Sequence, residues 1–405
     1  MSRVILHCDC NSFFASVETA LNPAYKNVPM AVCGSQEARH GIVLAKNELA
    51  KKYNIVTAET VFSAKKKCKN LVIAEPHYDK YVEYSKKVNE IYARYTDTIE
   101  PFGIDESWLD VTASQKIFGS GLEIAESIRR AVKKELNITV SIGVSFNKVF
   151  AKLGSDYKKP DAITVIDESN FKSIVFPLPV SSLLFVGKKT ADALLSMGIH
   201  TIGDLAKAKK EVLKIQLGKV GAMLHEYANG LDNSPVLSER EEIKSISNGF
   251  TFKHDLVGRE EARIGIEYLS EEIGKRLKQE GFLCSTIALT IKDEYLSSIQ
   301  RQRPISPNTD ISSEIANLAY GILCDEWSEA KPIRMITISV SGLIKKSSSV
   351  TQISFFEKAC EQDREKIEKT EITVDKIRQK FGFESILKGA VLSSDIGILS
   401  DKKKK

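Results

Sequence analysis

Short apolar runs alternate with amphipathic stretches along the first 100 residues. Runs of about six apolar residues are typical of buried strands, whereas apolar positions at i, i+3 and i+4 are typical of helices. By these criteria we predict strands at residues 4–9 and 30–33, and helices at residues 13–21, 47–53 and 81–95. The first helix should end at Asn22-Pro23, because proline cannot continue a helix.

Residues 99–112 have the pattern of a hairpin with acidic residues at its tip. Two strand-like runs, 99–104 and 108–112, flank the pair Asp105-Glu106. A helix follows, with apolar positions on one face between residues 122 and 136, and then a strand rich in β-branched residues at 138–144. This order of elements indicates an α+β unit of the ferredoxin-like type.

The pattern changes after residue 176. Six glycines interrupt short helical stretches as far as residue 230, and the polar residues 233–244, which include Pro235, are typical of a linker. Beyond the linker, a second α+β domain is predicted, with strands at 245–252, 285–292 and 333–340 and helices at 260–279 and 312–327. The last ~50 residues are polar and predict a flexible tail with one helix.

Composition adds a few limits to this picture. Of the 405 residues, 42% are hydrophobic and 27% are charged, which supplies enough apolar material for several globular domains. No stretch reaches the ~20 apolar residues of a membrane helix, so we expect no membrane association. The net charge of +5 permits a polyanionic partner without requiring one. The seven cysteines form no C-x-x-C pair, which favours reduced thiols in a cytoplasmic protein.

Three acids are candidates for a metal site. Asp9 ends the first predicted strand, and Asp105 and Glu106 form the tip of the hairpin. If the hairpin pairs beside the first strand, three carboxylates meet at one end of a sheet and repel one another unless cations neutralise them. Mg²⁺ prefers such oxygen ligands, and two ions about 3.5–4 Å apart can catalyse a phosphoryl displacement. The alternative is a strand-end cap beside a solvated acidic pair.

Longer motifs surround these acids. Residues 7–18 read HCDCNSFFASVE, residues 104–111 read IDESWLDV, and residues 145–160 read SFNKVFAKLGSDYKKP. In order and separation, these segments resemble the three motifs of the Y-family, translesion DNA polymerases, and they are most similar to the DinB branch. The resemblance covers roughly residues 1–345.

The resemblance implies a multidomain α+β fold arranged as a right hand. It would have a ferredoxin-like palm, small fingers, a helical thumb with a helix-hairpin-helix, and an α+β little finger. The implied ranges are 1–20 and 75–166 for the palm, 21–74 for the fingers, 167–232 for the thumb, 233–244 for the linker, 245–345 for the little finger and 346–405 for the tail.

The resemblance also implies a metal-dependent reaction. Asp9, Asp105 and Glu106 would hold two Mg²⁺ ions, with Asp105 and Glu106 as the catalytic pair and the Cys10 carbonyl as a further ligand. One ion would lower the pKa of the primer 3′-hydroxyl, and the other would neutralise the triphosphate and the departing pyrophosphate. The implied substrates are primer-template DNA and deoxynucleoside triphosphates.

Further residues are implied to bind the nucleotide. Phe14 would act as a steric gate against a 2′-hydroxyl, Phe13 would support the same pocket, and Lys159 would meet the triphosphate. On the sequence alone, Phe14 fits a core position of the first helix better.

Two positions depart from the family pattern. Asn11 stands where a second acid is common, although that acid is not the usual direct ligand. Glu48 and Lys51 stand where the family offers a tyrosine and an arginine to the triphosphate. Lys51 can still supply a point charge, but Glu48 cannot take the tyrosine's part.

The segment around Gly187, Lys188 and Lys189 resembles a helix-hairpin-helix, whose backbone N–H groups would contact DNA phosphates. Phe185 replaces the glycine that usually stands two residues earlier, so a glycine-rich turn between packed helices is an equal alternative. In the tail, Gln352, Ile353, Phe355 and Phe356 resemble the peptide that binds the bacterial sliding clamp.

Other functions remain open at this point. The chain could be a polymerase of the UmuC branch that needs activating partners, or a catalytically weak accessory protein bound to DNA or to the clamp. A metal-dependent nuclease is disfavoured, because it would have no use for a gate aromatic. We expect a monomer.

Overall fold

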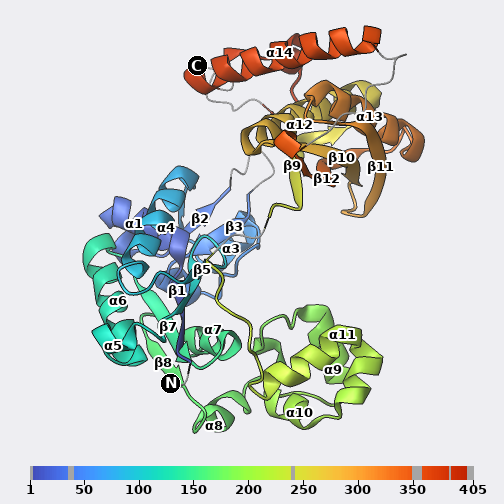
Figure 1. Ribbon diagram of the computed structural model, residues 1–405. Helices are drawn as coiled ribbons and strands as arrows, with labels where there is room; N and C mark the ends of the chain where they lie inside the picture. Colours follow the sequence, from blue (N-terminus) through green and yellow to red (C-terminus); the bar gives the residue numbers. More distant parts are fainter. Residues whose placement is uncertain (1–2, 35–40, 239–241, 349–357, 383–384, 399–405) are drawn as a thin grey trace. The chain divides into compact units, whose positions relative to one another are not determined.

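The computed structural model describes residues 3–34, 41–238, 242–348, 358–382 and 385–398 (Figure 1). The chain divides into two compact units, of which the first comprises residues 1–34 and 42–240 and the second comprises residues 35–41 and 241–405. In the described part of the chain, no helix has the length and apolar composition that a membrane span requires.

A five-stranded sheet forms the centre of the first unit. The middle strand β1 pairs antiparallel with β6 on one side and with β7 on the other, and β8 lies parallel to β7. The order across the sheet is β5 (Ile99–Pro101), β6 (Glu106–Asp110), β1 (Ile5–Cys10), β7 (Val140–Ser145) and β8 (Ile163–Ile166). The hairpin predicted around Asp105-Glu106 therefore pairs beside the first strand.

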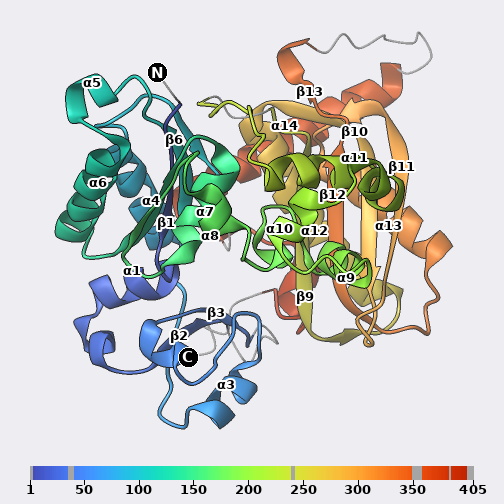
Figure 2. The same ribbon diagram turned by 90° about the horizontal axis from the view of Figure 1, so that it is seen from below.

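Both faces of β1 are covered, so all six of its residues are buried. Leu6, Cys8 and Cys10 share one core with α4 (Tyr78–Tyr92) and α6 (Gly121–Leu136). The alternate residues face α7 (Lys148–Tyr157) on the opposite side, and Figure 2 shows the helices on the two sides of the sheet. Because every second residue points the same way, this packing directs Asp9 towards α7.

A glycine allows α7 to approach the sheet closely. A Cβ atom on Gly143 of β7 would overlap the backbone of Ala151 and Ser155 in α7. Gly154 of α7 faces Gly143 from the other side of the contact, with its own Cβ position 2.9 Å from the Gly143 Cα. The backbone contact brings the polar side chains of α7 within reach of the end of β1.

A smaller sheet with the strand order β3-β2-β4 occupies the region after α1 (Phe13–Leu21). The sequence predicts a helix at residues 47–53, whereas the helix is shorter. Asn47 caps it by accepting a hydrogen bond from the Ala50 amide, and Asn54 adopts a positive φ that ends the helical run. The other elements are β2 (Met30–Cys33), β3 (Val43–Lys46), α2 (Glu48–Lys51), α3 (Val61–Lys67) and β4 (Val72–Ala74).

Helices dominate the region from residue 171 to residue 228, and they share a core with Val149, Phe150 and Leu153 of α7. Gly218 has φ 66° and ψ −146°, which divides the last helix into two straight parts. The helices are α8 (Phe171–Val175), α9 (Lys188–Ser196), α10 (Ile202–Lys207) and α11 (Lys210–Ala228).

The segment that follows α11 packs against the rest of the first unit. The sequence predicts a linker at 233–244, but Val236 is buried against Trp108 of the central sheet. The Leu237 amide donates to Glu100, which also pairs with Lys148 at 2.7 Å. One apolar side chain and one buried ion pair therefore hold residues 233–238 on the first unit, although their composition is polar.

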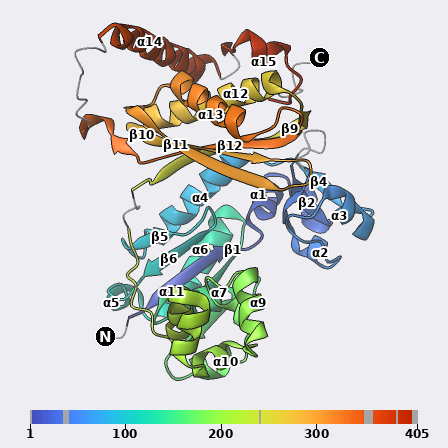
Figure 3. The ribbon, with the colours of Figure 1, turned by 90° about the vertical axis from the view of Figure 1, so that its right-hand side faces the viewer.

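The second unit contains a four-stranded sheet in the order β11-β10-β12-β9, with α12 (Arg259–Glu280) and α13 (Ser312–Glu326) packed on one face (Figure 3). The sequence predicts three of its strands but not β11. That strand reads SIQRQRPISPNT and lies at the edge of the sheet, where an exposed strand needs no apolar alternation. The strands are β9 (Ser245–Leu256), β10 (Phe282–Lys292), β11 (Ser298–Thr309), β12 (Ile333–Ser341) and the short β13 (Ile344–Lys345).

The tail differs from the expectation of a flexible segment with one helix. The described residues of the tail form two α-helices, α14 (Lys358–Phe381) and α15 (Gly389–Ser393), and Ile396 is buried in the core of the second unit. Charged residues fix α14. Glu371 pairs with Lys278 at 2.6 Å and accepts from the amide of Ser312, and Arg378 pairs with Glu271 at 2.8 Å. Polar composition suggested flexibility, but these partners lie far away in the sequence. The peptide with Gln352, Ile353, Phe355 and Phe356 lies outside the described residues.

Candidate active site

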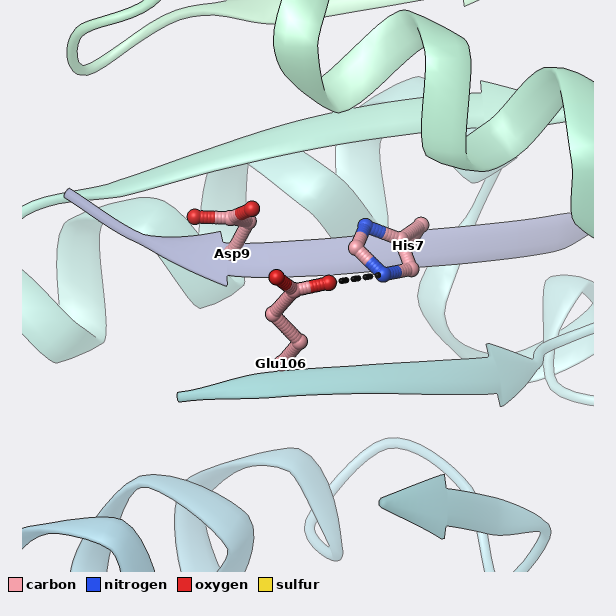
Figure 4. Close-up of side chains that lie close together, drawn as sticks. All are labelled: His7, Asp9 and Glu106. Carbon is pink, nitrogen blue, oxygen red and sulfur yellow. Dashed lines mark ion pairs between the residues drawn. The ribbon is translucent and has the colours of Figure 1, made fainter. Parts of the chain in front are cut away.

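Strand register brings two of the predicted acids face to face. Asp9 of β1 lies directly opposite Glu106 of β6, and the Cys10 amide donates a hydrogen bond of 3.0 Å to the Asp105 carbonyl. Residues opposite each other in an antiparallel pair point to the same face of the sheet. The carboxyl groups of Asp9 and Glu106 therefore meet on the α7 side, as Figure 4 shows.

Two lysines neutralise these acids. The Lys152 Nζ lies 3.1 Å from Asp9 Oδ2 and 2.7 Å from Glu106 Oε2, and the Lys159 Nζ lies 2.6 Å from the same Asp9 oxygen. Burial lowers the pKa of Lys152, but the charges of Asp9 and Glu106 outweigh burial and raise this pKa above its usual value. Lys152 thus stays protonated in a site that excludes much of the solvent.

The pKa values of Asp105 and Glu106 are shifted in opposite directions. Burial, with the charges of Asp9 and Glu106, raises the pKa of Asp105 to about 6. Burial opposes ionisation of Glu106 too, but contacts with His7 and Lys152 overcome it and lower the pKa of Glu106 to about 2. Asp105 is thus the acid whose charge the protein compensates least. A set of hard oxygen donors with uncompensated negative charge fits Mg²⁺.

His7 was not among the predicted site residues. Its side chain is fully buried, and its Nε2 lies 3.2 Å from Glu106 Oε2. Its Nδ1 lies 2.8 Å from the Ser155 hydroxyl, which itself donates to the Lys152 carbonyl. The sequence signal was its spacing, because His7 precedes Asp9 by two residues on a strand and shares its face.

His7 belongs to a close group of possible ligand atoms that does not include Asp105. Ligand atoms of His7, Asp9 and Glu106 all lie within 4.8 Å of one another, whereas Asp105 is not part of that group. Asp105 nevertheless lines the same pocket as Asp9 and Glu106. We regard His7 as a residue that holds Glu106, because its nitrogens already face Ser155 and the Glu106 carboxylate.

A pocket of about 400 Å³ opens beside the acids. This volume lies in the range of pockets that bind small molecules. It brings together all the residues predicted to bind metal and nucleotide, which are Asp9, Cys10, Phe13, Phe14, Lys51, Asp105, Glu106 and Lys159. Lys46 and Thr57 also line the pocket but were not predicted.

The Phe14 ring is fixed from one side. It stacks on Tyr81 with ring centroids 4.1 Å apart and an angle of 11° between the planes. The Tyr81 hydroxyl donates to the buried carboxylate of Glu18 at 2.5 Å, and Glu18 also contacts His77 at 3.0 Å. Phe13 is buried in the core behind it. Phe14 therefore lines the pocket with a ring that cannot easily turn away.

The two positions that depart from the family pattern have clear contacts. Asn11 donates to the Ser141 hydroxyl at 2.8 Å and accepts from the Thr139 hydroxyl and the Asp161 amide, so both ends of its side-chain amide are engaged by the protein. Glu48 pairs with Lys51 at 2.5 Å and accepts from the Ser12 hydroxyl at 3.2 Å. Lys51 thus has a carboxylate partner within its own helix.

Gly187, Lys188 and Lys189 lie at the start of α9, with Gly187 as its N-cap. No atom lies within 4 Å of the Cβ position of Gly187, so the glycine leaves this helix end open. Phe185 has a positive φ of 68° and is exposed, two residues before Gly187. The turn keeps the left-handed conformation that a glycine would adopt more easily. Lys188 and Lys189 remain candidates for phosphate contacts.

Comparisons with known proteins agree with this architecture. Residues 8–156 match the impB/mucB/samB family, residues 243–355 match the C-terminal domain of that family, and residues 183–232 match the thumb domain of DNA polymerase-iota. DNA polymerase IV of Acetivibrio thermocellus is 48% identical over 97% of this chain and 98% of its own length. DNA polymerase IV 1 of Bacillus subtilis is 35% identical over 97% of this chain and 94% of its own length.

A solved structure shows the same fold. A chimeric Y-family DNA polymerase, Dbh-Dpo4(243-245)-Dbh, matches with a TM-score of 0.75 at 23% identity, over 84% of this chain and 99% of its own. The predicted right-hand architecture of palm, fingers, thumb and little finger is confirmed. The chain belongs to the impB/mucB/samB family of Y-family polymerases. Within that family, it is of the DinB type.

The raised pKa of Asp105 has a consequence for stability. Because its folded-state pKa of about 6 exceeds the usual value of 3.8, the ionised carboxylate destabilises the metal-free fold above pH 6, and this cost vanishes below about pH 4. The variant Asp105→Asn should therefore be more stable than the parent by about 1–3 kcal/mol at pH 8 in EDTA, with little difference at pH 4. Urea unfolding at the two pH values measures this. Glu90→Gln, at an exposed position of α4, is the control. If Asp105→Asn is no more stable than the parent at pH 8, the ionised Asp105 carboxylate does not destabilise the fold.

Proposed function

We propose that the pocket at the end of β1 and β6 adds deoxynucleotides to the 3′ end of a DNA primer with the help of two Mg²⁺ ions. As a DinB-type Y-family member, the chain is a template-directed DNA polymerase that acts in translesion synthesis. The observation that carries the proposed site is the convergence of Asp9, Asp105 and Glu106 on one pocket.

Asp9, Asp105 and Glu106, with the Cys10 carbonyl, would hold the ions. Once bound, the ions would lower the pKa of the primer 3′-hydroxyl and neutralise the triphosphate. His7 keeps Glu106 in place. Until ions bind, Lys152 and Lys159 balance the negative charge of the acids. Lys159 contacts Asp9 in the absence of nucleotide and is long enough to turn towards a triphosphate. Lys51 would supply a second charge from the fingers.

We assign DNA contacts to Gly187, Lys188 and Lys189 at the open end of α9, where backbone N–H groups can meet phosphates of the primer-template. The enzyme should act as a monomer in the cytoplasm. In the described part of the chain all cysteines are free thiols, which suits a reducing compartment.

A sliding clamp is the proposed protein partner. Gln352, Ile353, Phe355 and Phe356 would bind it, and they lie between β13 and α14, two elements of the second unit. Large apolar residues in such a connection suit a pocket on a partner.

Primer extension tests the central proposal. The purified chain should extend a primer with Mg²⁺ and deoxynucleotides, without other proteins. Glu106→Gln should lower the rate at least about 10³-fold, because the variant loses a metal ligand while keeping the shape of the side chain. DNA binding should stay near the parental value, and Glu90→Gln should be fully active. Near-parental extension by Glu106→Gln would refute the assignment, and activity only with added partners would favour the UmuC alternative.

The gate assignment predicts a change of sugar selectivity. Phe14→Ala should incorporate ribonucleotides far better than the parent, while deoxynucleotide turnover falls less, because the ring excludes one hydroxyl by shape. The ratio of kcat/KM for a deoxynucleotide to that for the matching ribonucleotide measures this effect. Phe62→Ala, at an exposed position of α3 outside the pocket, is the control. An unchanged ratio in Phe14→Ala would mean that Phe14 only packs.

If the tail peptide binds the sliding clamp, loaded clamp should stimulate primer extension. Changing Gln352, Ile353, Phe355 and Phe356 together to Ala should abolish the stimulation that loaded clamp gives, without altering extension in its absence, because a tether raises local concentration only. Ser354→Ala, within the same peptide, should behave as the parent. Equal stimulation of the parent and the fourfold variant would show that these residues do not bind the clamp.

A further inference from the structure

Three lysines line the pocket beside the acids, and two of them are already neutralised. Lys159 pairs with Asp9 at 2.6 Å and with Asp156 at 2.7 Å, and Lys51 pairs with Glu48 at 2.5 Å. Lys46, by contrast, makes no ion pair with any residue that the structure describes. Within the described residues, it is therefore the pocket lysine without an ion-pair partner.

The Lys46 side chain is nevertheless held in place. It extends from the last residue of β3, opposite Ala31 of β2, and its Nζ donates a hydrogen bond of 2.9 Å to the Thr57 hydroxyl. Thr57 also lines the pocket. Threonine contributes a neutral acceptor, which orients an ammonium group without cancelling its charge. Such an arrangement suits a group that waits for an anion.

The surroundings make this placement unfavourable in the absence of an anion. Partial burial, and then the nearby charge of Lys51, lower the pKa of Lys46. A cation beside another cation in a partly desolvated pocket costs free energy unless a negative charge joins it. The nearby acids Glu59 and Glu48 oppose this shift, but Glu59 pairs with Lys67 and Glu48 pairs with Lys51. The three acids on the other wall of the pocket suit metal ions, so a ligand is the natural source of an anion for Lys46.

We propose that Lys46 binds the triphosphate of the incoming nucleotide from the fingers side of the pocket. This inference rests on the proposed polymerase function and deepens it. Lys46 supplies positive charge from the fingers side of the pocket. Lys51 supplies such charge only in part, because it pairs with Glu48, which also accepts a hydrogen bond from the Ser12 hydroxyl. A nucleoside triphosphate is the ligand class, since its charge is common to all four nucleotides.

Single-nucleotide insertion by Lys46→Met tests the inference, because methionine keeps an unbranched side chain and removes the charge. KM should rise about tenfold or more for each of the four deoxynucleotides, with kcat changed by no more than about twofold, as expected for loss of a charged hydrogen bond. Lys46→Arg should recover most of the affinity. Glu48→Gln should lower KM, because it releases Lys51 from its partner.

Lys52→Met is the matched control, since Lys52 is the exposed C-cap of α2 and does not line the pocket. Its KM should equal the parental value, and no variant should unfold at a clearly lower temperature than the parent. An unchanged KM in Lys46→Met would overturn the inference. A rise for one or two bases only would also overturn it, because that pattern means contact with the base and not with the triphosphate.

A binding measurement separates this inference from the polymerase function. Titration of deoxynucleotide onto the chain with primer-template DNA and Ca²⁺ needs no turnover. Weaker binding by Lys46→Met than by the parent supports the inference even if extension by the parent fails, in which case the proposed function alone is wrong. Equal binding by the two proteins overturns the inference even if the parent is an active polymerase.

Discussion

The charge balance at the end of β1 is the constraint on which the rest of the site depends. Antiparallel register places Asp9 opposite Glu106, and two carboxylates so close together repel unless a cation joins them. Lys152 lies between them, and it reaches that position because Gly143 lets α7 approach the sheet without a side chain in between. Backbone packing therefore determines the charge balance of this site. If α7 lay slightly further from the sheet, Lys152 could not lie between Asp9 and Glu106.

The same constraint explains why the acids are unequal. His7 and Lys152 stabilise the charge of Glu106, whereas Asp105 lies partly buried beside two other acids without a dedicated cation. We expect the buried charge of Asp105 to lower the stability of the fold and a bound metal ion to offset this loss, a trade that is common at functional sites. On the fingers side the imbalance has the opposite sign, because Lys46 forms no ion pair with any residue of the described ranges. A nucleotide that carries negative charge and arrives with metal ions would correct both imbalances at once.

Much of this could be predicted from the sequence. The α+β class and the polymerase architecture follow from motif order, and the three acids from their place at strand ends. The roles of His7 and Lys152 could not be predicted, because they depend on which face of β1 meets α7, and that is decided by packing between distant segments. Periodicity failed for β11, an edge strand without apolar alternation, and for the tail, whose Arg378 and Glu371 find partners about 100 and 60 residues earlier. Asn11 departs from the family pattern, and its amide links the end of β1 to residues 139–141 and to Asp161.

The central claim is that these three acids hold two metal ions for nucleotide addition. Its most direct test is a crystal structure of the chain with primer-template DNA, a non-hydrolysable deoxynucleotide and Mn²⁺, with anomalous scattering used to locate the metal. The account predicts two anomalous peaks about 3.5–4 Å apart. Asp9, Asp105 and Glu106 should each contact at least one ion, and Lys152 should no longer lie between Asp9 and Glu106. No peak at the three acids, or a single ion bound to the His7 nitrogen, would contradict it.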